Sequence, residues 1–198
     1  MKKQVIFATT NQEKMKEIRM ILADLPVEVL SLSDAGIEVE IIEDGQTFEE
    51  NAIIKAKKVM ELTGMITLAD DSGLEVDYLD KAPGIYSARF LGENTPYAVK
   101  NKYILEQLEG VEKERRTARF LCAIAAAFPD GRVLTTKGSI EGFIGWHEAG
   151  EYGFGFDPIF FLPEYGCTTA QLSPKAKNEI SHRGIALKAM KEVLEKDI

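Results

Sequence analysis

The stretch Leu68-Ala69-Asp70-Asp71-Ser72-Gly73-Leu74 places two adjacent carboxylates between an apolar run and a Ser-Gly pair. Such an apolar run is typical of a buried strand, and a strand interior cannot hold two unpaired acids. We therefore expect the strand to end at Asp70 and Asp71, where the two side chains share a divalent cation and one of them polarises a water molecule. The alternative is a solvated turn, which Asp, Ser and Gly also favour.

Sequence patterns on both sides of this stretch alternate between strands and helices. Apolar runs predict strands over residues 4–8, 27–32, 117–128, 132–140 and 159–162. The sequence Pro129-Asp130-Gly131 predicts a hairpin turn between two of them. Helical spacing and capping residues predict helices from Asn11 to Pro26, from Thr47 to Gly64, from Pro96 to Gly110 and after Ser173-Pro174. A final predicted helix has Ile185, Ala189 and Val193 on its apolar face, with Met190 and Leu194 as further candidates for that face.

This alternation predicts an α/β fold with a mixed sheet and flanking helices. Strand–helix units favour parallel neighbours, whereas the hairpin supplies an antiparallel pair. The 198 residues, of which 45% are hydrophobic and 28% charged, fit a single globular domain over residues 1–198.

Charge and hydropathy exclude several classes of partner. The net charge of −8 argues against a nucleic-acid polymer, because proteins that bind one present a basic surface. The longest apolar run, residues 120–128, is too short to span a bilayer, and the apolar start at residues 5–8 turns polar too soon for a secretion signal. Cys122 and Cys167 lack the spacing of a zinc site or a disulfide framework, and Cys122 lies in an apolar run typical of the core. We therefore expect a soluble cytoplasmic protein that binds neither nucleic acid nor membrane.

The segment between the first predicted strand and helix is a candidate phosphate site. A helix N-terminus presents unpaired N–H groups and the positive end of the helix dipole, and both attract anions. Hydroxyl, amide and ammonium groups follow one another here in the order Thr9, Thr10, Asn11, Gln12, Glu13 and Lys14. The alternative is plain helix capping by Thr10 or Asn11. The segment is not a Walker loop, because the glycine spacing and the Gly-Lys-Ser/Thr ending are missing.

Three further segments contain residue types suited to ligands. Glu43-Asp44-Gly45 either supplies another carboxylate to a cation or forms an acidic turn before a helix. The rings of Gly153-Phe154-Gly155-Phe156-Asp157-Pro158 suit stacking on a purine, with core packing as the alternative. A basic cluster, which either lines an inter-helix corner or lies on the surface, consists of Lys175, Lys177, His182 and Arg183.

Taken in order, these segments resemble the inosine triphosphate pyrophosphatase family, also called XTP/dITP diphosphatases. The matching stretches are Thr9-Thr10-Asn11-Gln12-Glu13-Lys14, Thr47-Phe48-Glu49-Glu50-Asn51-Ala52, Ala69-Asp70-Asp71-Ser72-Gly73-Leu74, Ala82-Pro83-Gly84-Ile85-Tyr86-Ser87-Ala88-Arg89, Gly153-Phe154-Gly155-Phe156-Asp157-Pro158 and Ile180-Ser181-His182-Arg183-Gly184. Each stretch is weak alone, but their order across nearly the whole chain is highly specific.

The resemblance implies Mg²⁺-dependent hydrolysis of deaminated purine nucleoside triphosphates (ITP, dITP and XTP) to the monophosphate and pyrophosphate. It also implies an elongated α/β fold with two lobes around a central cleft, and a homodimer. Asp71 would accept a proton and bind the metal, with Asp70 and Glu43 as further metal ligands. The residues that would contact the substrate are Thr9, Thr10, Asn11, Gln12, Glu13 and Lys14 at the polyphosphate, with Ser72, Phe154, Gly155, Phe156, Asp157, Lys177, His182 and Arg183.

The chain departs from the family pattern at two positions. Thr10 stands where relatives often have Gly, and Phe156 stands where many have Tyr, so a hydroxyl contact is missing. Neither change removes a charged group. The choice between Glu43 and the adjacent Asp44 as metal ligand stays open.

Two alternative functions are a pyrophosphatase for modified pyrimidine triphosphates and a catalytically silent nucleotide-binding protein. The paired aspartates favour an enzyme, because clustered carboxylates hinder the binding of an anion alone.

Overall fold

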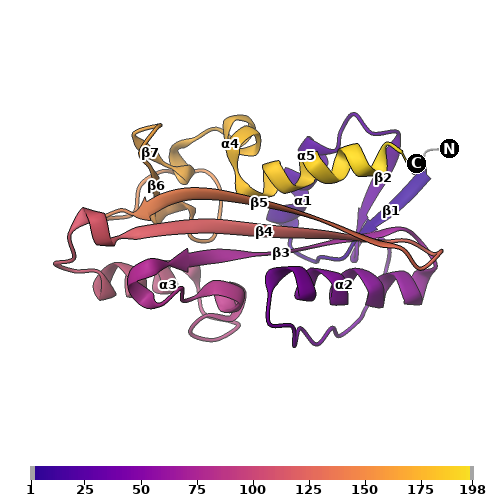
Figure 1. Cartoon of the computed structure of the whole chain (residues 1–198), viewed down its shortest axis with the longest axis horizontal. Helices are drawn as coiled ribbons and strands as arrows, with labels where there is room; N and C mark the ends of the chain where they lie inside the picture. The colour runs from indigo at the N-terminus through magenta and orange to yellow at the C-terminus, as the bar shows by residue number, and fades with distance from the viewer. Residues whose placement is uncertain (1–2, 197–198) are drawn as a thin grey trace. The chain divides into compact units, whose positions relative to one another are not determined.

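The computed structural model describes residues 3–196, and within them a mixed sheet of seven strands is flanked by helices (Figure 1). The strands are β1 Lys3–Phe7, β2 Val27–Ser31, β3 Thr67–Val76, β4 Thr117–Ala127, β5 Val133–Ile144, β6 Phe160–Leu162 and β7 Cys167–Thr168. The helices are α1 Gln12–Ile21, α2 Phe48–Thr63, α3 Tyr97–Gln107, α4 Pro174–Ile180 and α5 His182–Leu194. Short 3₁₀ helices cover Asp77–Leu79, Gly84–Arg89, Lys113–Arg115, Asp157–Ile159 and Thr169–Gln171.

The strand order is β2-β1-β3-β4-β5-β6-β7, and the pairing confirms a mixed sheet. β1 lies parallel to both β2 and β3, as expected for strands joined through helices. β5 pairs antiparallel with β6, and β6 with β7. The predicted hairpin joins β4 to β5, where the Phe128 N–H donates to the Arg132 carbonyl oxygen at 3.0 Å.

The chain divides into two compact units, to both of which the long strands β3, β4 and β5 contribute. The first unit comprises the described residues up to Asp71, Cys122–Gly138 and the residues from His182 on. The second unit comprises Ser72–Leu121 and Ser139–Ser181.

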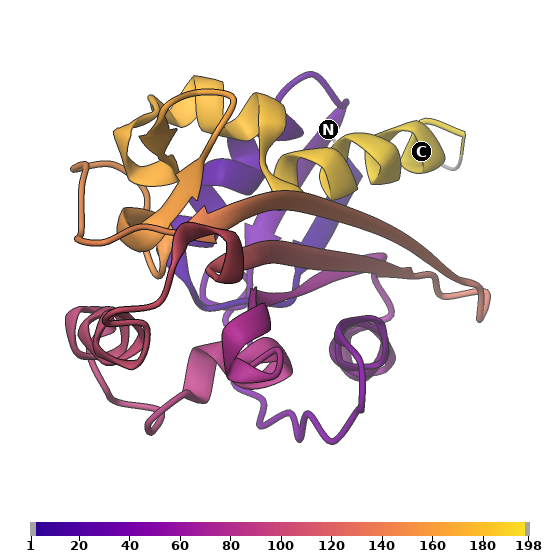
Figure 2. The ribbon, with the colours of Figure 1, turned by 60° about the vertical axis from the view of Figure 1, so that its left-hand side comes forward.

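In the first unit, helices cover both faces of the strands. Leu68 of β3 belongs to a core cluster with α1 and α5, whereas the next residue, Ala69, belongs to a separate cluster with α2. This alternation follows from the period of two in a strand. In both views α5 lies on one side of β3 and β4 and α2 on the other (Figures 1 and 2). Cys122 is buried in the first cluster, as predicted.

β2 forms one edge of the sheet, and Arg19 of α1 reaches it. The Arg19 guanidinium donates from Nε and Nη2 to the Val29 carbonyl oxygen at 3.4 and 3.3 Å, and it pairs with Asp34 at 2.6 Å. The Asp34 carboxylate also accepts from the N–H and the hydroxyl of Ser31, the last residue of β2.

The second unit has its own core, with Leu74 and Val76 of β3, Ile104 of α3 and Phe160 of β6. The fully buried Arg116 ends α3 by donating from Nη1 to the Leu108 carbonyl oxygen at 2.5 Å. A helix C-terminus leaves carbonyl groups unpaired, and a buried guanidinium satisfies them.

Two predicted helices differ from the structure in detail. α1 ends at Ile21 rather than near Pro26, because a turn that still buries Leu22 and Leu25 replaces its last helical turn. α5 leaves Ile185 40% exposed, whereas Ala186, Leu187, Met190 and Leu194 are buried. The helix begins at His182 and buries Arg183, so Ile185 lies away from the core.

No helix among residues 3–196 is both long enough and apolar enough to cross a lipid bilayer.

Candidate active site

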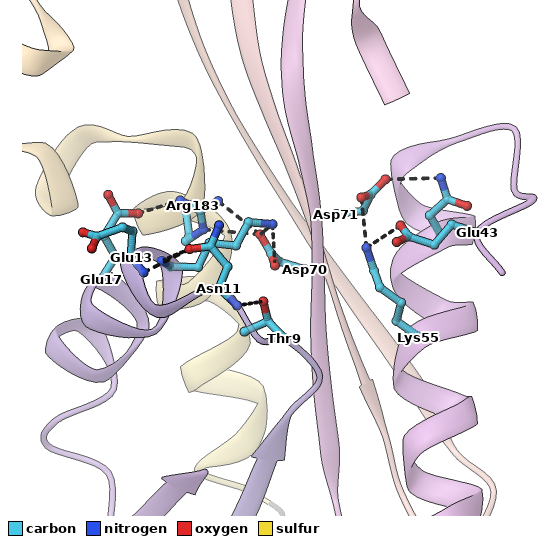
Figure 3. Close-up of polar contacts among 11 residues, drawn as sticks. Thr9, Asn11, Glu13, Glu17, Glu43, Lys55, Asp70, Asp71 and Arg183 are labelled. Carbon is cyan, nitrogen blue, oxygen red and sulfur yellow. Dashed lines mark hydrogen bonds and ion pairs between the residues drawn. The ribbon is translucent and has the colours of Figure 1, made fainter. Parts of the chain in front are cut away.

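The two aspartates lie inside β3, not at its end. β3 continues through Ser72 and Gly73 to Val76, so the predicted strand end is wrong, and so is the alternative of a solvated turn. The strand tolerates both acids because each has a cationic partner, which removes the cost of an unpaired buried charge. Successive strand residues point to opposite faces, so Asp70 and Asp71 face different helices (Figure 3).

Asp70 faces α1 and α5. Lys14 Nζ lies 3.0 Å from Asp70 Oδ1, and Arg183 Nη2 lies 3.1 Å from Oδ2. Arg183 also donates from Nη1 to Glu17 Oε2 at 2.5 Å, so the guanidinium lies between two carboxylates. Both Asp70 and Arg183 are buried.

Asp71 faces α2. Lys55 Nζ lies 3.0 Å from Asp71 Oδ1 and 2.6 Å from Glu43 Oε2, so one ammonium group bridges the two carboxylates. Asn51, one turn before Lys55, donates from Nδ2 to Asp71 Oδ2 at 3.3 Å. Asp71, Lys55 and Glu43 are labelled at the right of Figure 3.

The two aspartates differ in acidity. Burial raises the pKa of Asp70, but the Lys14, Arg183 and Lys55 cations outweigh burial and hold it well below its usual range. Burial raises the pKa of Asp71 above 3.8, and the Lys55 cation only partly offsets this. Neighbouring carboxyl groups with opposite shifts are typical of acid–base sites, in which the group of higher pKa exchanges protons.

Glu43, rather than Asp44, faces this site. Residues 37–45 form an extended segment without regular secondary structure, in which Ile37, Val39 and Ile41 pack against the α2 cluster. Because side chains alternate along an extended chain, Glu43 also points inward, whereas Asp44 is exposed. The structure thus places the Glu43 carboxylate, and not that of Asp44, against Lys55.

The predicted phosphate segment is arranged as a helix cap. Asn11 is the N-cap of α1, and its Oδ1 accepts from the N–H groups of Glu13 and Lys14 at 3.0 and 3.1 Å. Thr9 Oγ1 accepts from the Asn11 N–H at 3.1 Å, and the Gln12 amide donates to the Thr10 carbonyl oxygen. Capping by Asn11 is therefore confirmed, and within this segment Lys14 is the residue that contacts Asp70.

In the second unit, the glycine-rich loop closes on Asp157. The buried Asp157 accepts at Oδ2 from the Phe154 N–H at 2.8 Å and from Lys177 Nζ at 2.5 Å. Its Oδ1 accepts from the Thr169 hydroxyl at 2.9 Å. Gly153 has a φ of +73°, and a Cβ atom there would collide with the Asp157 carboxylate. Asp157 and Lys177 therefore fix the loop.

The two loop phenylalanines have different surroundings. Phe156 is buried in the core of its unit, with its ring 5.1 Å from the Tyr97 ring in an edge-on arrangement. Phe154 is only half-buried, and Lys177 Nζ lies 4.8 Å from the centre of its ring. Core packing is thus confirmed for Phe156, while Phe154 stays partly exposed and has a cation over its ring.

The remaining residues that the sequence suggested as substrate contacts lie in β3, in the glycine-rich loop and at the start of α5. Ser72 is half-buried in β3, Gly155 has a positive φ beside Tyr97, and His182 is a buried residue at the start of α5. Lys175 is exposed, so it does not share the buried environment of Lys177.

The chemistry of the donor set fits a magnesium ion on the α2 side of β3. Mg²⁺ binds oxygen ligands, typically one or two carboxylates together with substrate phosphates and water. Glu43 and Asp71 provide two carboxylates that already share a cation, Lys55, whereas Asp70 faces the opposite side. Within the described part of the chain, no three His, Cys, Asp or Glu side chains form a ready-made metal cluster.

Three residues of this arrangement were missed by the sequence analysis: Glu17, Asn51 and Lys55. The spacing of these residues along their helices indicated that they belong together. Glu17 lies three residues after Lys14, so both lie on one face of α1. Lys55 lies four residues after Asn51, so both lie on one face of α2. Lys55 also interrupts the apolar stripe of Ala52, Ala56 and Val59, where a charged residue needs a partner.

Known proteins align in sequence with nearly the whole of this chain. A curated dITP/XTP pyrophosphatase from Bacillus licheniformis is 48% identical over 193 residues, covering 98% of each chain. The dITP/XTP pyrophosphatase of Bacillus subtilis is 46% identical over 193 residues, again covering 98% of each chain.

Solved structures also superpose on nearly the whole of this chain. The Staphylococcus aureus Ham1 protein superposes with a TM-score of 0.87 at 38% identity, covering 99% of this chain and 100% of the other. A HAM1 protein from Coxiella burnetii superposes with a TM-score of 0.88 at 39% identity, covering 98% and 99%. The model of the Ham1 family matches residues 5–193, and the chain therefore belongs to the Ham1 family.

Proposed function

We propose that the protein is a pyrophosphatase that hydrolyses deaminated purine nucleoside triphosphates, namely ITP, dITP and XTP, to the monophosphate and pyrophosphate. The relatives at 46–48% identity are named dITP/XTP pyrophosphatases, which supports this substrate class. The observation in the chain itself that carries the proposal is the contrast between Asp70 and Asp71, which are adjacent in β3 but differ in partners and in pKa.

Asp71 acts as the general base in this proposal. Its carboxylate takes a proton from a water molecule, and the water oxygen attacks the α-phosphorus. The bond from this phosphorus to the oxygen that bridges to the β-phosphorus breaks, and pyrophosphate leaves with the electron pair. A raised pKa suits a general base because it brings the carboxylate closer to the operating pH.

Asp70, which the resemblance implies as a further metal ligand, has a different role in this proposal, because its side chain faces away from Glu43 and Asp71. Its low pKa keeps it ionised, and its contacts with Lys14 and Arg183 make it an anchor for these two cations. Lys14, at the N-terminus of α1, then neutralises charge on the polyphosphate together with the Thr9–Asn11 segment.

Glu43 and Asp71 would hold the divalent cation. Mg²⁺ supplies neutralisation of the phosphate charge and polarisation of the phosphoryl oxygens. Lys55 holds the two carboxylates in place before the substrate arrives, because its ammonium group bridges them.

Further substrate contacts are proposed for Ser72, Phe154, Gly155, Phe156, Asp157, Lys177, His182 and Arg183. Among them Phe154 is the partly exposed aromatic residue that would stack on a base, and Asp157 fixes the loop that carries it. We further propose that the protein is a cytoplasmic homodimer that removes deaminated nucleotides from the nucleotide pool.

The test is pyrophosphate release across a panel of ITP, dITP, XTP, GTP, ATP and modified pyrimidine triphosphates, with and without Mg²⁺. Preferential, Mg²⁺-dependent hydrolysis of the first three supports the proposal. Equal treatment of ATP and ITP would rule out a role in nucleotide cleansing. Binding without any release would make the protein a silent nucleotide-binding module.

A further inference from the structure

The extended 37–45 segment has no hydrogen-bonded strand neighbour among the elements described, yet it delivers Glu43 to the site. Its inward side chains Ile37, Val39 and Ile41 make only partly buried apolar contacts. Such contacts are not directional, and a slip of one residue would exchange Glu43 for Asp44. The Ile37 N–H donates to the Leu32 carbonyl oxygen at 2.9 Å and fixes the start of the segment, so the register at Glu43 needs a second polar contact near the C-terminal end.

Asn51 provides this contact at the C-terminal end of the segment. Its Oδ1 accepts from the Gly45 N–H at 2.9 Å, and its Nδ2 donates to Asp71 Oδ2 at 3.3 Å. The residue is fully buried in the first turn of α2. One amide group thus joins the backbone two residues after Glu43 to the carboxylate that faces Glu43 across Lys55.

The position of Gly45 shows how closely the segment approaches α2. A Cβ atom at Gly45 would lie 2.7 Å from Asn51 Oδ1 and 3.0 Å from the Asn51 backbone nitrogen. A larger residue would therefore push the segment away from Asn51. The next amide, that of Gln46, donates to Glu50 Oε2 at 2.6 Å, so the chain stays attached to α2 beyond the segment.

We propose that Asn51 is a positioning residue that locks the 37–45 segment in the register that turns Glu43, rather than Asp44, toward Lys55 and Asp71. The lock is a property of the fold, and its effect on turnover rests on the proposed pyrophosphatase function. Asn51 acts through Asp71 and Glu43 and not on the polyphosphate, so its loss lowers kcat more than it changes KM.

The experiment compares Asn51→Ala and Gly45→Ala with a control, Val59→Ala. Val59 is fully buried on the same helix, two turns beyond Asn51, so its truncation weakens the packing of α2 but leaves the Asn51 amide and its hydrogen bond with Gly45 in place. Hydrogen exchange of the Gly45 amide, melting temperature, and kcat and KM for dITP are measured for the wild type, the three variants and the Asn51→Ala/Gly45→Ala double variant.

We expect Asn51→Ala and Gly45→Ala each to speed exchange at the Gly45 amide at least tenfold and to lower kcat at least tenfold, with KM within threefold. Since both act on one contact, the double variant should lose little more than the worse single variant. Val59→Ala should lower the melting temperature at least as much while Gly45 exchange and kcat stay near wild type.

The two hypotheses fail in different ways. Unchanged hydrogen exchange at the Gly45 amide in Asn51→Ala and Gly45→Ala would overturn the role of Asn51. A fall in kcat in Val59→Ala as large as in those two variants would also overturn it, because general weakening of α2 would then explain the loss of activity. A wild-type protein that releases no pyrophosphate would overturn the proposed function instead, and the exchange data alone would then decide whether the lock exists. Gly45→Ala keeps Asn51 in place, so the test stands even where Asn51→Ala does not fold.

Discussion

Asp70 and Asp71 are neighbours in β3 but contact helices on opposite faces of the sheet, Asp70 through Lys14 and Arg183 and Asp71 through Lys55. A single strand thereby separates an acid that is held ionised from an acid whose pKa is raised. The two positions are therefore expected to respond differently to the same substitution.

Asp71→Asn should abolish turnover and leave the fold intact. An amide cannot take the proton of the attacking water, and loss of a general base lowers the rate by about 10²–10⁴-fold. The melting temperature should stay level or rise, because ionised Asp71 is disfavoured by burial. Steady-state kinetics and thermal unfolding check this prediction, and a kcat within threefold of wild type would remove Asp71 from its role.

Asp70 should contribute stability at neutral pH that acid removes. Its pKa in the folded protein lies below the value of 3.8 expected when unfolded, so the unfolded state binds more protons as the pH falls. The free energy of unfolding should therefore be at its full value above about pH 5 and decline as the pH falls through the folded-state pKa. Urea unfolding from pH 3 to pH 7 should show this decline in wild type and in Asp71→Asn, and a shallower one in Asp70→Asn. Equal declines in all three proteins would contradict the assignment.

Lys14→Ala and Lys177→Ala should both lower kcat/KM strongly, with different effects on stability. Lys177 is almost fully buried against Asp157, and removal of one partner of a buried pair costs about 3–5 kcal/mol. Lys14 is more exposed, and Asp70 keeps Arg183 as a partner after its removal, so Lys14→Ala should cost much less stability. Kinetics with dITP and thermal unfolding of both variants test this. Full kcat/KM in either variant would place that lysine outside the site.

Glu43→Gln and Asp44→Asn form a matched pair of charge-removing variants at adjacent positions. Glu43→Gln should lower kcat and raise the Mg²⁺ concentration needed for half-maximal activity, because it removes one of the two proposed metal carboxylates. Asp44→Asn should leave both near wild type, because Asp44 is exposed. A Mg²⁺ titration of activity distinguishes the two positions, and a larger effect at Asp44 would contradict the register of the 37–45 segment.

The sequence predicted those parts of the fold that depend on neighbouring residues and did not predict those that depend on residues far apart in the chain. The Thr47 N-cap and the Gly64 C-cap of α2 were predicted because capping acts through residues only a few positions apart. The continuation of β3 through Asp70 and Asp71 was not predicted, since it depends on cations from α1, α2 and α5 that the local sequence does not contain.

The sequence named Asp71, Lys14 and Lys177 as candidates but not the partners that the structure gives them. The strand was expected to end at Asp70 and Asp71, so the separation of the two side chains onto opposite faces, which follows from the period of two in a continuing strand, was not predicted. Lys55 and Glu17 were missed because their importance arises from pairs distant in sequence, such as Arg183 with Glu17.

The contact of Arg19 with β2 has a consequence for how copies of the protein behave in concentrated solution. An edge strand exposes backbone groups that can pair with the edge of another molecule and begin an aggregate. Here the guanidinium occupies the Val29 carbonyl oxygen in the middle of β2, and its charge, held by Asp34, would have to be displaced before a foreign strand could dock. The same arginine that joins α1 to the sheet thus also protects this edge against self-association.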